Sequence, residues 1–507
     1  MLARTRSVAL VGTEARLVDV EVDTQTGVPT FRIVGLPTKS VTEAEQRTRS
    51  ALLASGYEWP KQRIVANLAP GALRKEGTHF DLALALGILA SKERIPQPPL
   101  KDWIVVGELA LDGSVRQVPG TLAAAIACRQ ADLKGLVCPA VNAAEAATVE
   151  GVEVVPVQTL DECIQWVRGR WTPPDVQVVA IASPSGLEDI SEVRGQGMAK
   201  QALEIAAAGG HNLLLAGPPG SGKTMLARRL PGILPPMSAE ESLDVTRVHS
   251  VAGLVPPGAS LIVERPFRTP HHNVSLAGMV GGGTGLARPG EASLAHLGVL
   301  FLDEVALFRP EVLDALRGPL EEGLIRIARS GGAITYPCRL SLVAAMNPCP
   351  CGYRGDRLRG CRCSDRRIES YNARLSGPLL DRFDLRIAMT RLTRRELLGQ
   401  PEGEDSQTVR ARVRAARELQ EERYGPGVTN ATASRSMLDL GVRLSSNARE
   451  SLGDAIERLS LTGRGMVRVL RVARTVADLA AADAVTDEHL AQALMFRMDD
   501  DIEGAAA

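Results

Sequence analysis

A glycine-rich loop between a short apolar run and a helix is the strongest constraint on the fold of this chain. Residues 213–216 are apolar and suit a central strand of a parallel sheet. The loop that follows is Gly217, Pro218, Pro219, Gly220, Ser221, Gly222, Lys223 and Thr224. Such loops turn backbone N–H groups onto phosphate oxygens, with the lysine on the β- and γ-phosphates and the threonine hydroxyl on Mg²⁺. Because the strand, every loop position and a helix from Met225 onward agree, we expect an ATP and Mg²⁺ site rather than an ordinary turn.

Length, charge and cysteine usage set the other bounds. The chain has 507 residues, enough for about three domains. Lys+Arg and Asp+Glu each total 59, so any basic surface that binds nucleic acid must be local. No segment approaches the about 18 apolar residues of a membrane span, and we expect a cytoplasmic protein without membrane contact. Four of the eight cysteines are scattered, which argues against a secreted disulfide framework: Cys128, Cys138, Cys163 and Cys338.

Residues 1–170 predict an α+β domain. The expected strands cover residues 16–23 and 63–68, the expected helices residues 42–55, 82–90 and 122–129, and an expected hairpin residues 103–113. A proline-bearing stretch over residues 171–188 then predicts a linker.

Two segments of this domain resemble the proteolytic domain of Lon-type proteases, which has a ribosomal S5 domain 2-like fold. They are residues 77–79 before a buried helix, and residues 107–113 before residues 119–122. That family acts through a serine–lysine dyad, whereas this chain has His79 and Leu122 at the matching positions. The resemblance therefore implies the fold without peptidase activity, and we expect His79 to be a structural or interaction residue.

Two further apolar segments end in polar residues, as strands that border a nucleotide site do. Residues 298–302 run into Asp303 and Glu304, a Walker B pattern in which the first carboxylate holds Mg²⁺ through its water shell and the second polarises the attacking water. The alternative is a strand that merely ends at an acidic helix cap. Residues 340–346 end in Asn347, which resembles the sensor-1 residue of AAA+ ATPases. Residues 189–196 are similar to the stretch that borders the adenine pocket in that family.

The segments between these strands indicate which clade of AAA+ ATPases the chain resembles. Residues 263–297 form a long insertion with the composition of mobile loops. Residues 325–336 predict a hairpin with Gly331-Gly332 at its tip, and Arg326 and Arg329 on the approach are candidate DNA contacts. Such an insertion and such a hairpin before sensor 1 are typical of the clade that holds magnesium chelatase motors and MCM helicases.

Four cysteines follow in two close pairs: Cys349 and Cys351, then Cys361 and Cys363. Two such pairs can supply four thiolates to one tetrahedral ion, and zinc is the expected metal. Reduced thiols or a redox pair are the alternatives. Residues 353–374 contain seven arginines and three acidic residues, a net charge of +4 that suits phosphate contacts or a basic subunit interface.

The last candidate site residues are arginines. Residues 376–385 resemble the arginine-finger segment of chelatase and MCM-type proteins, which places Arg382 in a neighbouring subunit's ATP site and implies a ring. A helix is expected over residues 407–423. Arg464 resembles the sensor-2 arginine, and it begins a 4-3-3 series for which a solvated cationic face is the usual explanation: Arg464, Arg468, Arg471 and Arg474.

Together these motifs resemble the ComM/YifB family of bacterial magnesium-chelatase-like AAA+ ATPases. The resemblance implies a degenerate Lon-like domain over residues 1–170, an ATPase core over residues 189–395 and a helical lid over residues 396–507. It also implies a homo-hexameric helicase that binds single-stranded or branched DNA and migrates branches beside the recombinase machinery during natural transformation. The alternatives are a chelatase-type remodeller of a protein partner for metal insertion, another ATP-dependent remodeller, and a protease. The missing serine–lysine dyad disfavours the protease.

Overall fold

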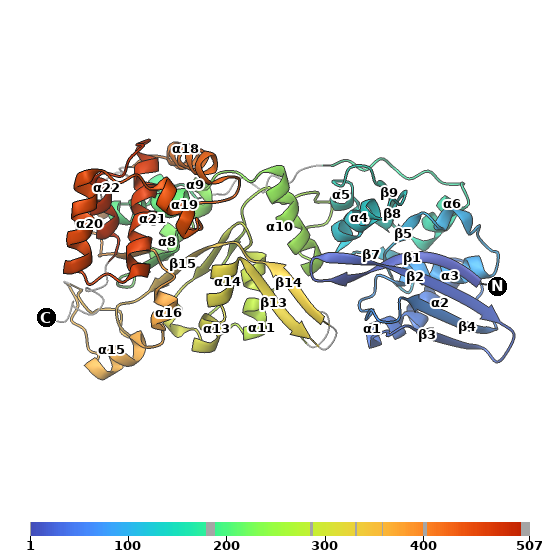
Figure 1. The fold of residues 1–507 in the computed structure, drawn as a ribbon. Helices are drawn as coiled ribbons and strands as arrows, with labels where there is room; N and C mark the ends of the chain where they lie inside the picture. The colour runs from blue at the N-terminus through green and yellow to red at the C-terminus, as the bar shows by residue number, and fades with distance from the viewer. Residues whose placement is uncertain are drawn as a thin grey trace.

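The computed structural model describes residues 2–178, 188–283, 287–329, 332–356, 358–398 and 403–497, without the side chains of residues 329, 332, 397 and 398. An N-terminal domain and a central region, called the motor region after the ATPase core expected over residues 189–395, lie end to end, with helix α10 (Ala239–Ala252) at their junction (Figure 1). Helices at the carboxyl end of the chain pack on the motor region. No helix in the described ranges is long and apolar enough to cross a membrane.

The N-terminal domain is built on a mixed sheet of seven strands. Their order is β3 (Thr30–Val34), β4 (Arg63–Ala69), β2 (Glu14–Gln25), β1 (Leu2–Val11), β5 (Trp103–Val105), β8 (Gly135–Pro139) and β9 (Glu153–Val157). The alternation over residues 16–23 is confirmed, because Val18, Val20 and Val22 are all buried. The helices expected in this domain are α2 (Ala44–Ala54), α3 (Asp81–Ser91) and α4 (Thr121–Gln130).

The prediction of a hairpin over residues 103–113 is wrong in part. Strand β5 pairs in parallel with β1 and β8, which lie far from it in the sequence. From the expected hairpin, the antiparallel pairing is limited to β6 (Glu108–Leu109), which pairs with β7 (Val115–Arg116). Periodicity could indicate a strand at Trp103, but it could not indicate the partner, because the partner is set by packing of the whole sheet.

The motor sheet is parallel throughout, and its order is β11 (Phe267–Arg268), β12 (Val299–Leu302), β15 (Ser341–Met346), β10 (Leu213–Ala216) and β16 (Leu385–Ala388). Strands β10, β12 and β15 are almost wholly buried apolar runs, as expected for a sheet covered on both faces. Since parallel strands end at the same edge, the residues that follow these three strands meet there.

Two segments of the motor add detail to the expectation. The insertion at residues 263–297, expected to be too long for a simple connection, adds β11 to the sheet and contains α11 (Leu276–Val280) and α12 (Glu291–Leu294). The hairpin is present as β13 (Leu324–Arg329) and β14 (Gly332–Pro337). Gly332 pairs with Arg329, so it belongs to a strand and not to the tip, and residues 330 and 331 lie outside the described residues.

The helix after the phosphate loop is divided. It begins at Lys223 as α8 (Lys223–Ala227), and helix resumes at α9 (Leu230–Ile233). Pro231 lies in the first turn of α9, where a missing N–H is tolerated but where a continuous helix would need that donor. Helix α7 (Gly197–Gly209) precedes β10 and packs beneath the sheet edge.

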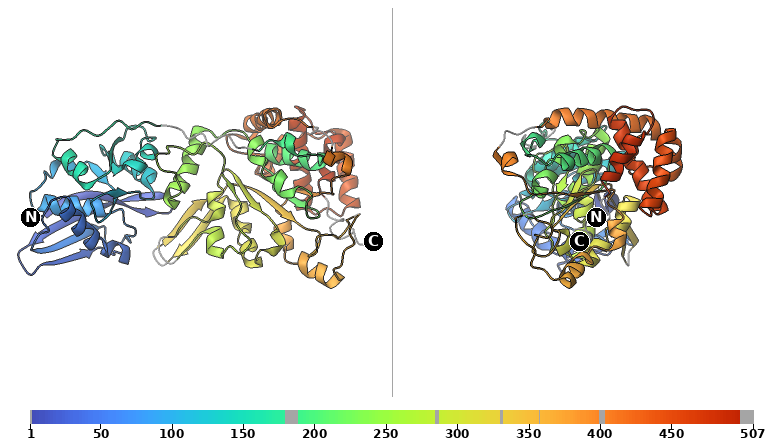
Figure 2. Two further views of the ribbon diagram at one scale, coloured as in Figure 1. Left: turned by 180° about the vertical axis from the view of Figure 1, so that it is seen from behind. Right: turned by 90° about the vertical axis from the view of Figure 1, so that its left-hand side faces the viewer.

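The lid comprises α18 (Ser406–Tyr424), α19 (Arg435–Gly441), α20 (Ser446–Arg458), α21 (Gly463–Leu479) and α22 (Asp487–Met495), on one side of the motor sheet (Figures 1 and 2). Its apolar residues share one core with α7 and the sheet. The solvated arginine face expected on α21 is wrong, because Arg474 is 1% exposed and pairs with Asp478. Arg468 and Arg471 are also bonded, to Asp381 and to the carbonyl of Ala433.

Helix α10 joins the motor to the N-terminal domain. It starts with a capping box between Ser238 and Glu241, and its last turns pack against α4. The N–H of Gly120 donates to the carbonyl of Ser250 at 2.9 Å, and Leu10 and Val251 share a small apolar cluster. The two domains therefore contact each other through backbone and apolar groups, besides the linker.

Candidate functional site

The phosphate loop has the backbone geometry that its glycines require. Gly220 and Gly222 have φ of +79° and +90°, which L side chains rarely adopt. A side chain on Gly217 would place its Cβ 2.5 Å from the carbonyl oxygen of Met389. Lys223 Nζ donates to the carbonyls of Gly217 and Pro218, and it lies 3.3 Å from Asn347 Oδ1. Burial lowers the pKa of Lys223. A bound anion beside the ammonium group would oppose this effect and favour the protonated form.

The three strand ends bring the other predicted groups to this loop. Thr224 Oγ1 donates to Asp303 Oδ2 at 2.8 Å, so the two groups predicted to hold Mg²⁺ are adjacent. Glu304 is exposed and has φ of +49°, a strained value for a residue with a side chain. Asn347 follows β15 beside Lys223. The site can therefore hold a Mg²⁺-bound triphosphate with a free carboxylate beyond its last phosphate.

The segment expected beside adenine is tied to the loop. Gln196 Nε2 donates to the carbonyls of Ser221 at 3.1 Å and Thr390 at 2.7 Å. Arg229 pairs with Glu188 and Glu192, which holds the start of this segment against α8 and α9. These contacts hold residues 188–196 against the phosphate loop.

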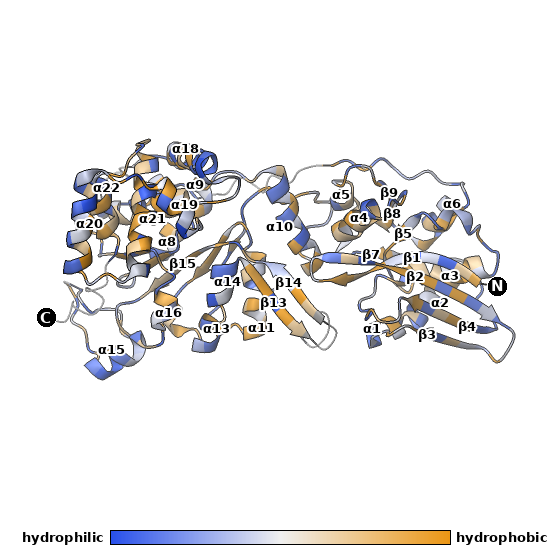
Figure 3. Ribbon diagram, viewed as in Figure 1, coloured by the Kyte–Doolittle hydropathy of each residue, from blue (hydrophilic) through white to orange (hydrophobic). Residues whose placement is uncertain are grey.

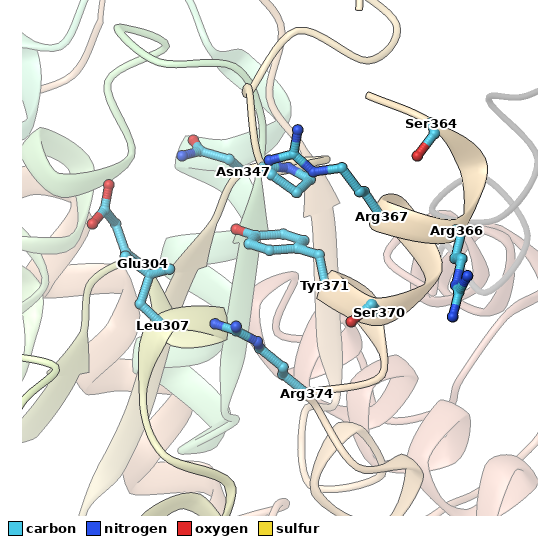
Figure 4. A pocket seen from close by; sticks show the side chains of 10 residues that line it. Glu304, Leu307, Asn347, Ser364, Arg366, Arg367, Ser370, Tyr371 and Arg374 are labelled. Atoms are coloured by element: carbon cyan, nitrogen blue, oxygen red, sulfur yellow. The ribbon is translucent and has the colours of Figure 1, made fainter. Parts of the chain in front are cut away.

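A cavity of about 500 Å³ opens beside Glu304 and Asn347 (Figure 4). Helix α15 (Asp365–Asn372) forms its other wall, and this helix is largely hydrophilic in Figure 3. Arg367 and Tyr371 extend from this helix toward Asn347, and Arg374 extends toward Leu307. Burial raises the pKa of Tyr371. Tyr371 was not among the residues predicted from the sequence, since a lone tyrosine carries no motif.

Arg382 and Arg464 lie outside this cluster of side chains. Arg382 is 18% exposed and pairs with Glu321 at the end of α14 (Arg317–Glu322). The neighbouring Asp381 pairs with Arg468 of the lid at 2.9 Å. Arg464 is exposed at the start of α21, and its side chain makes no hydrogen bond or ion pair with other described residues. Within one chain, neither arginine is bonded to the phosphate loop in the described ranges.

The four clustered cysteines form one compact group. Their sulfur atoms all lie within 4.8 Å of one another, and Cys349 Sγ is 3.4 Å from Cys351 Sγ and 3.6 Å from Cys361 Sγ. Four sulfurs around a tetrahedral zinc, each about 2.3 Å from the ion, are about 3.8 Å apart. The residues present thus fit a zinc ion in number, spacing and chemistry.

The candidate DNA contacts lie on the hairpin. Arg326 pairs across the hairpin with Thr335 in the strand register and forms an ion pair with Glu322. Its side chain is 59% exposed, so it is accessible to a ligand. The side chain of Arg329 lies outside the described residues. The turn between β1 and β2 reaches this hairpin, since a Cβ on Gly12 would lie 3.1 Å from Ile334.

Three family models match the chain. They are "Subunit ChlI of Mg-chelatase" over residues 20–142, "Magnesium chelatase, subunit ChlI" over residues 189–397, and "Magnesium chelatase, subunit ChlI C-terminal" over residues 403–497. The middle match contains the phosphate loop, both carboxylates, the cysteines and Arg382.

Curated relatives match along almost the whole chain. Competence protein ComM of Haemophilus influenzae is 43% identical over 505 residues, which is 98% of this chain and 97% of the relative. Protein YifB of Escherichia coli is 41% identical over 495 residues, 97% of this chain and 96% of the relative. An uncharacterized protein of Mycobacterium tuberculosis is 44% identical over 498 residues, 98% of each chain.

Proposed function

The chain belongs to the family of magnesium-chelatase-like AAA ATPases that includes ComM and YifB, and on that premise we propose that it is a hexameric, ATP-driven DNA helicase that migrates DNA branches. The observation that carries the ATPase part is the meeting of Lys223, Asp303 and Asn347 at one sheet edge. The DNA part is supported by the exposed Arg326 on the hairpin and by 43% identity to a protein named for competence.

Each side chain at the sheet edge has its own role in ATP hydrolysis. Thr224 and Asp303 would hold Mg²⁺, which neutralises charge on the β- and γ-phosphate oxygens. Lys223 binds the same phosphates, and its amide partner Asn347 orients the attacking water. Glu304 accepts a hydrogen bond from that water and polarises it, because its carboxylate is exposed just beyond Asp303. The proton released on attack passes to Glu304 or to solvent.

The position of Arg382 supports a ring of subunits. Its ion pair with Glu321 keeps it away from the phosphate loop of its own chain. A neighbouring subunit could receive it beside Glu304, where it would stabilise the charge that develops on the γ-phosphate. Each ATP site would then be complete only between two copies. Arg464, at the exposed start of a lid helix, is proposed as the sensor that links the lid to bound ATP.

The cysteine group is proposed to hold one structural zinc ion through Cys349, Cys351, Cys361 and Cys363. The N-terminal domain is proposed to share the Lon-like fold without its activity. His79 there is buried and bonds to the carbonyl of Val8 at 2.7 Å, and Leu122 is fully buried. Neither residue offers a nucleophile to a substrate.

The proposal is tested by strand displacement and by branch migration of a synthetic four-way junction. The wild type should unwind forked DNA with ATP, and Lys223→Ala should not, because the triphosphate loses its main cation. Equal activity of wild type and Lys223→Ala would refute it. ATPase rates with single-stranded, duplex and forked DNA identify the DNA structure that stimulates the enzyme most. The proposed setting of this activity is recombination during natural transformation.

The hairpin is tested with a matched pair of arginines. Arg326 and Arg414 are both exposed, by 59% and 67%, and each forms an ion pair with a glutamate four residues away. We expect Arg326→Ala to lose DNA stimulation of the ATPase and Arg414→Ala to keep it, since only Arg326 lies on the hairpin. Equal loss in both variants would place the DNA contact elsewhere.

A second candidate function has one observation in its favour. The descriptions of all three family models name a magnesium chelatase subunit. This supports a motor that remodels a protein partner for metal insertion. That function predicts an ATPase insensitive to DNA and dependent on a porphyrin-binding partner. Stimulation by forked DNA without any partner protein would exclude it.

A further inference from the structure

The cysteine group adjoins the ATP site, and this contact has a consequence for catalysis. Only Pro348 separates Asn347, the residue beside Lys223, from Cys349. Cys349 is fully buried, and its sulfur lies 3.4 Å from that of Cys351 and 3.6 Å from that of Cys361, so Cys349 is part of the packed cysteine group. A shift of the cysteine group would therefore move the amide that faces the γ-phosphate site.

A second contact runs from the cysteine group directly to the phosphate loop. Gly352 follows Cys351 and has φ of +83°. A Cβ built on Gly352 would lie 2.6 Å from Cδ and 2.7 Å from Cγ of Pro219, and 3.8 Å from Cγ of Asn347. The proline ring is rigid and cannot turn away as a long side chain can. The backbone of the cysteine segment thus lies against the loop that cradles the phosphates.

A third contact anchors the far side of the segment. Asp356 pairs with Arg391 at 2.9 Å, and the ring of Tyr353 lies beneath the same guanidinium, 5.7 Å from it. Arg391 follows Met389 and Thr390, whose backbone borders Gly217 and Gln196. The cysteine segment consequently touches the ATP site at sensor 1, at the phosphate loop and at the end of β16.

From these contacts we propose that zinc bound by the four cysteines positions Asn347 and Pro219, so that ATP turnover depends on zinc although the ion lies outside the nucleotide site. This inference rests on the zinc site and the ATPase proposed above. Without the ion, four thiols are joined only by weak S–H contacts, which cannot hold two separate chain segments together against thermal motion. Zinc replaces these with four strong bonds, and the energy of metal binding becomes energy of local folding.

The first experiment removes and restores the ion in the full-length protein. Zinc per chain is measured by elemental analysis, and it is then removed with a nitrogen-donor chelator that leaves excess Mg²⁺ in place. We expect about one zinc per chain, and a fall of about tenfold or more in kcat/KM for ATP on removal, because misplacement by about 1 Å is costly at an active site. Added Zn²⁺ should restore the rate, and added Ca²⁺ should not.

The second experiment separates position from metal content. Gly352 and Gly355 both have positive φ, +83° and +75°, but a Cβ on Gly355 would meet nothing within 4 Å. Gly352→Ala and Gly355→Ala therefore carry similar backbone strain, and only the first presses on Pro219. Gly352→Ala should keep its zinc, weaken binding of a fluorescent ATP analogue and lower kcat/KM about tenfold or more, while Gly355→Ala should keep wild-type values.

A third pair of variants tests the ligand set at an exposed position. Cys361→Ser should lose zinc and turnover, whereas Cys361→His should retain both in part, since imidazole is also a zinc ligand.

The outcomes distinguish this inference from those it rests on. Protein without zinc after reducing purification would refute the zinc site, and with it the coupling. Zinc whose removal leaves kcat/KM unchanged, or equal behaviour of Gly352→Ala and Gly355→Ala, would refute the coupling alone. Absence of ATPase in zinc-loaded wild type would refute the ATPase proposal.

Discussion

A buried carboxyl group at the domain junction makes the stability of the N-terminal domain depend on pH. Glu145 lies on the short helix α5 (Ala143–Ala146) and is 1% exposed. Its Oε1 accepts a hydrogen bond from Asn142 Nδ2 at 2.7 Å. Burial raises the pKa of Glu145 from 4.5 to about 7, against the opposing effect of the neighbouring polar groups of Ser250 in α10 and of Asn142.

The sign and size of the effect follow from these two pKa values. Between pH 4.5 and about 7 the folded chain holds a proton that the unfolded chain releases. The free energy of unfolding therefore falls as pH rises through this window and is constant above it. A difference of about 2.5 pKa units corresponds to about 3 kcal/mol, since one unit is about 1.4 kcal/mol. Glu145→Gln, which has the same shape and no charge, should remove this dependence.

Tryptophan fluorescence can follow this domain by itself, because Trp59, Trp103 and Trp166 lie within it and Trp171, the first residue of the expected linker, packs against its core. Urea unfolding at pH 5 and pH 8 should show the Glu145→Gln variant gaining stability over wild type by up to about 3 kcal/mol at the higher pH. Glu153→Gln is the control, since the side chain of Glu153 is 63% exposed. A difference between wild type and Glu145→Gln that is the same at both pH values would refute the reasoning.

The remaining predictions concern the motor. Glu304→Gln should bind ATP normally and hydrolyse it about 100-fold or more slowly, because the water loses its polarising carboxylate; single-turnover ATPase assays and nucleotide titration check this. Arg382→Ala should turn over slowly with nucleotide bound, and mixing it with Lys223→Ala should restore part of the rate if the arginine acts in a neighbour; normal turnover of Arg382→Ala would reject its role. His211→Ala should lower the melting temperature of the motor region in calorimetry, since buried His211 bonds to Asp384 and to the lid at 2.8 Å each; an unchanged melting temperature would contradict this.

Sequence analysis predicted the nucleotide loop and its flanking strands well because their chemistry is contiguous. The glycines, Lys223 and Thr224 act from one stretch of backbone, and their order alone implies their use. The meeting of Asp303 with this loop could also be predicted, since parallel strands end at one edge.

The errors arose where tertiary packing, and not the local pattern, decided what surrounds a residue. The helical spacing of Arg474 with three other arginines was correct, but Arg474 is buried against Asp478 and two backbone carbonyls of the following turn. Similarly, Trp103 belongs to a strand whose parallel neighbours are β1 and β8. Periodicity reports which side of an element is apolar, and it does not report which element covers that side.

By itself, then, the sequence determined an ATP-binding motor of the chelatase type, with its loop, carboxylates and clustered cysteines, because each of these depends on residues close together along the chain. Only the tertiary structure decided that Gly352 lies against Pro219, that Tyr371 lines a cavity beside Glu304, and that α10 docks on α4. These contacts join segments that are distant in the chain, and close packing between them selects their positions, which no local pattern encodes.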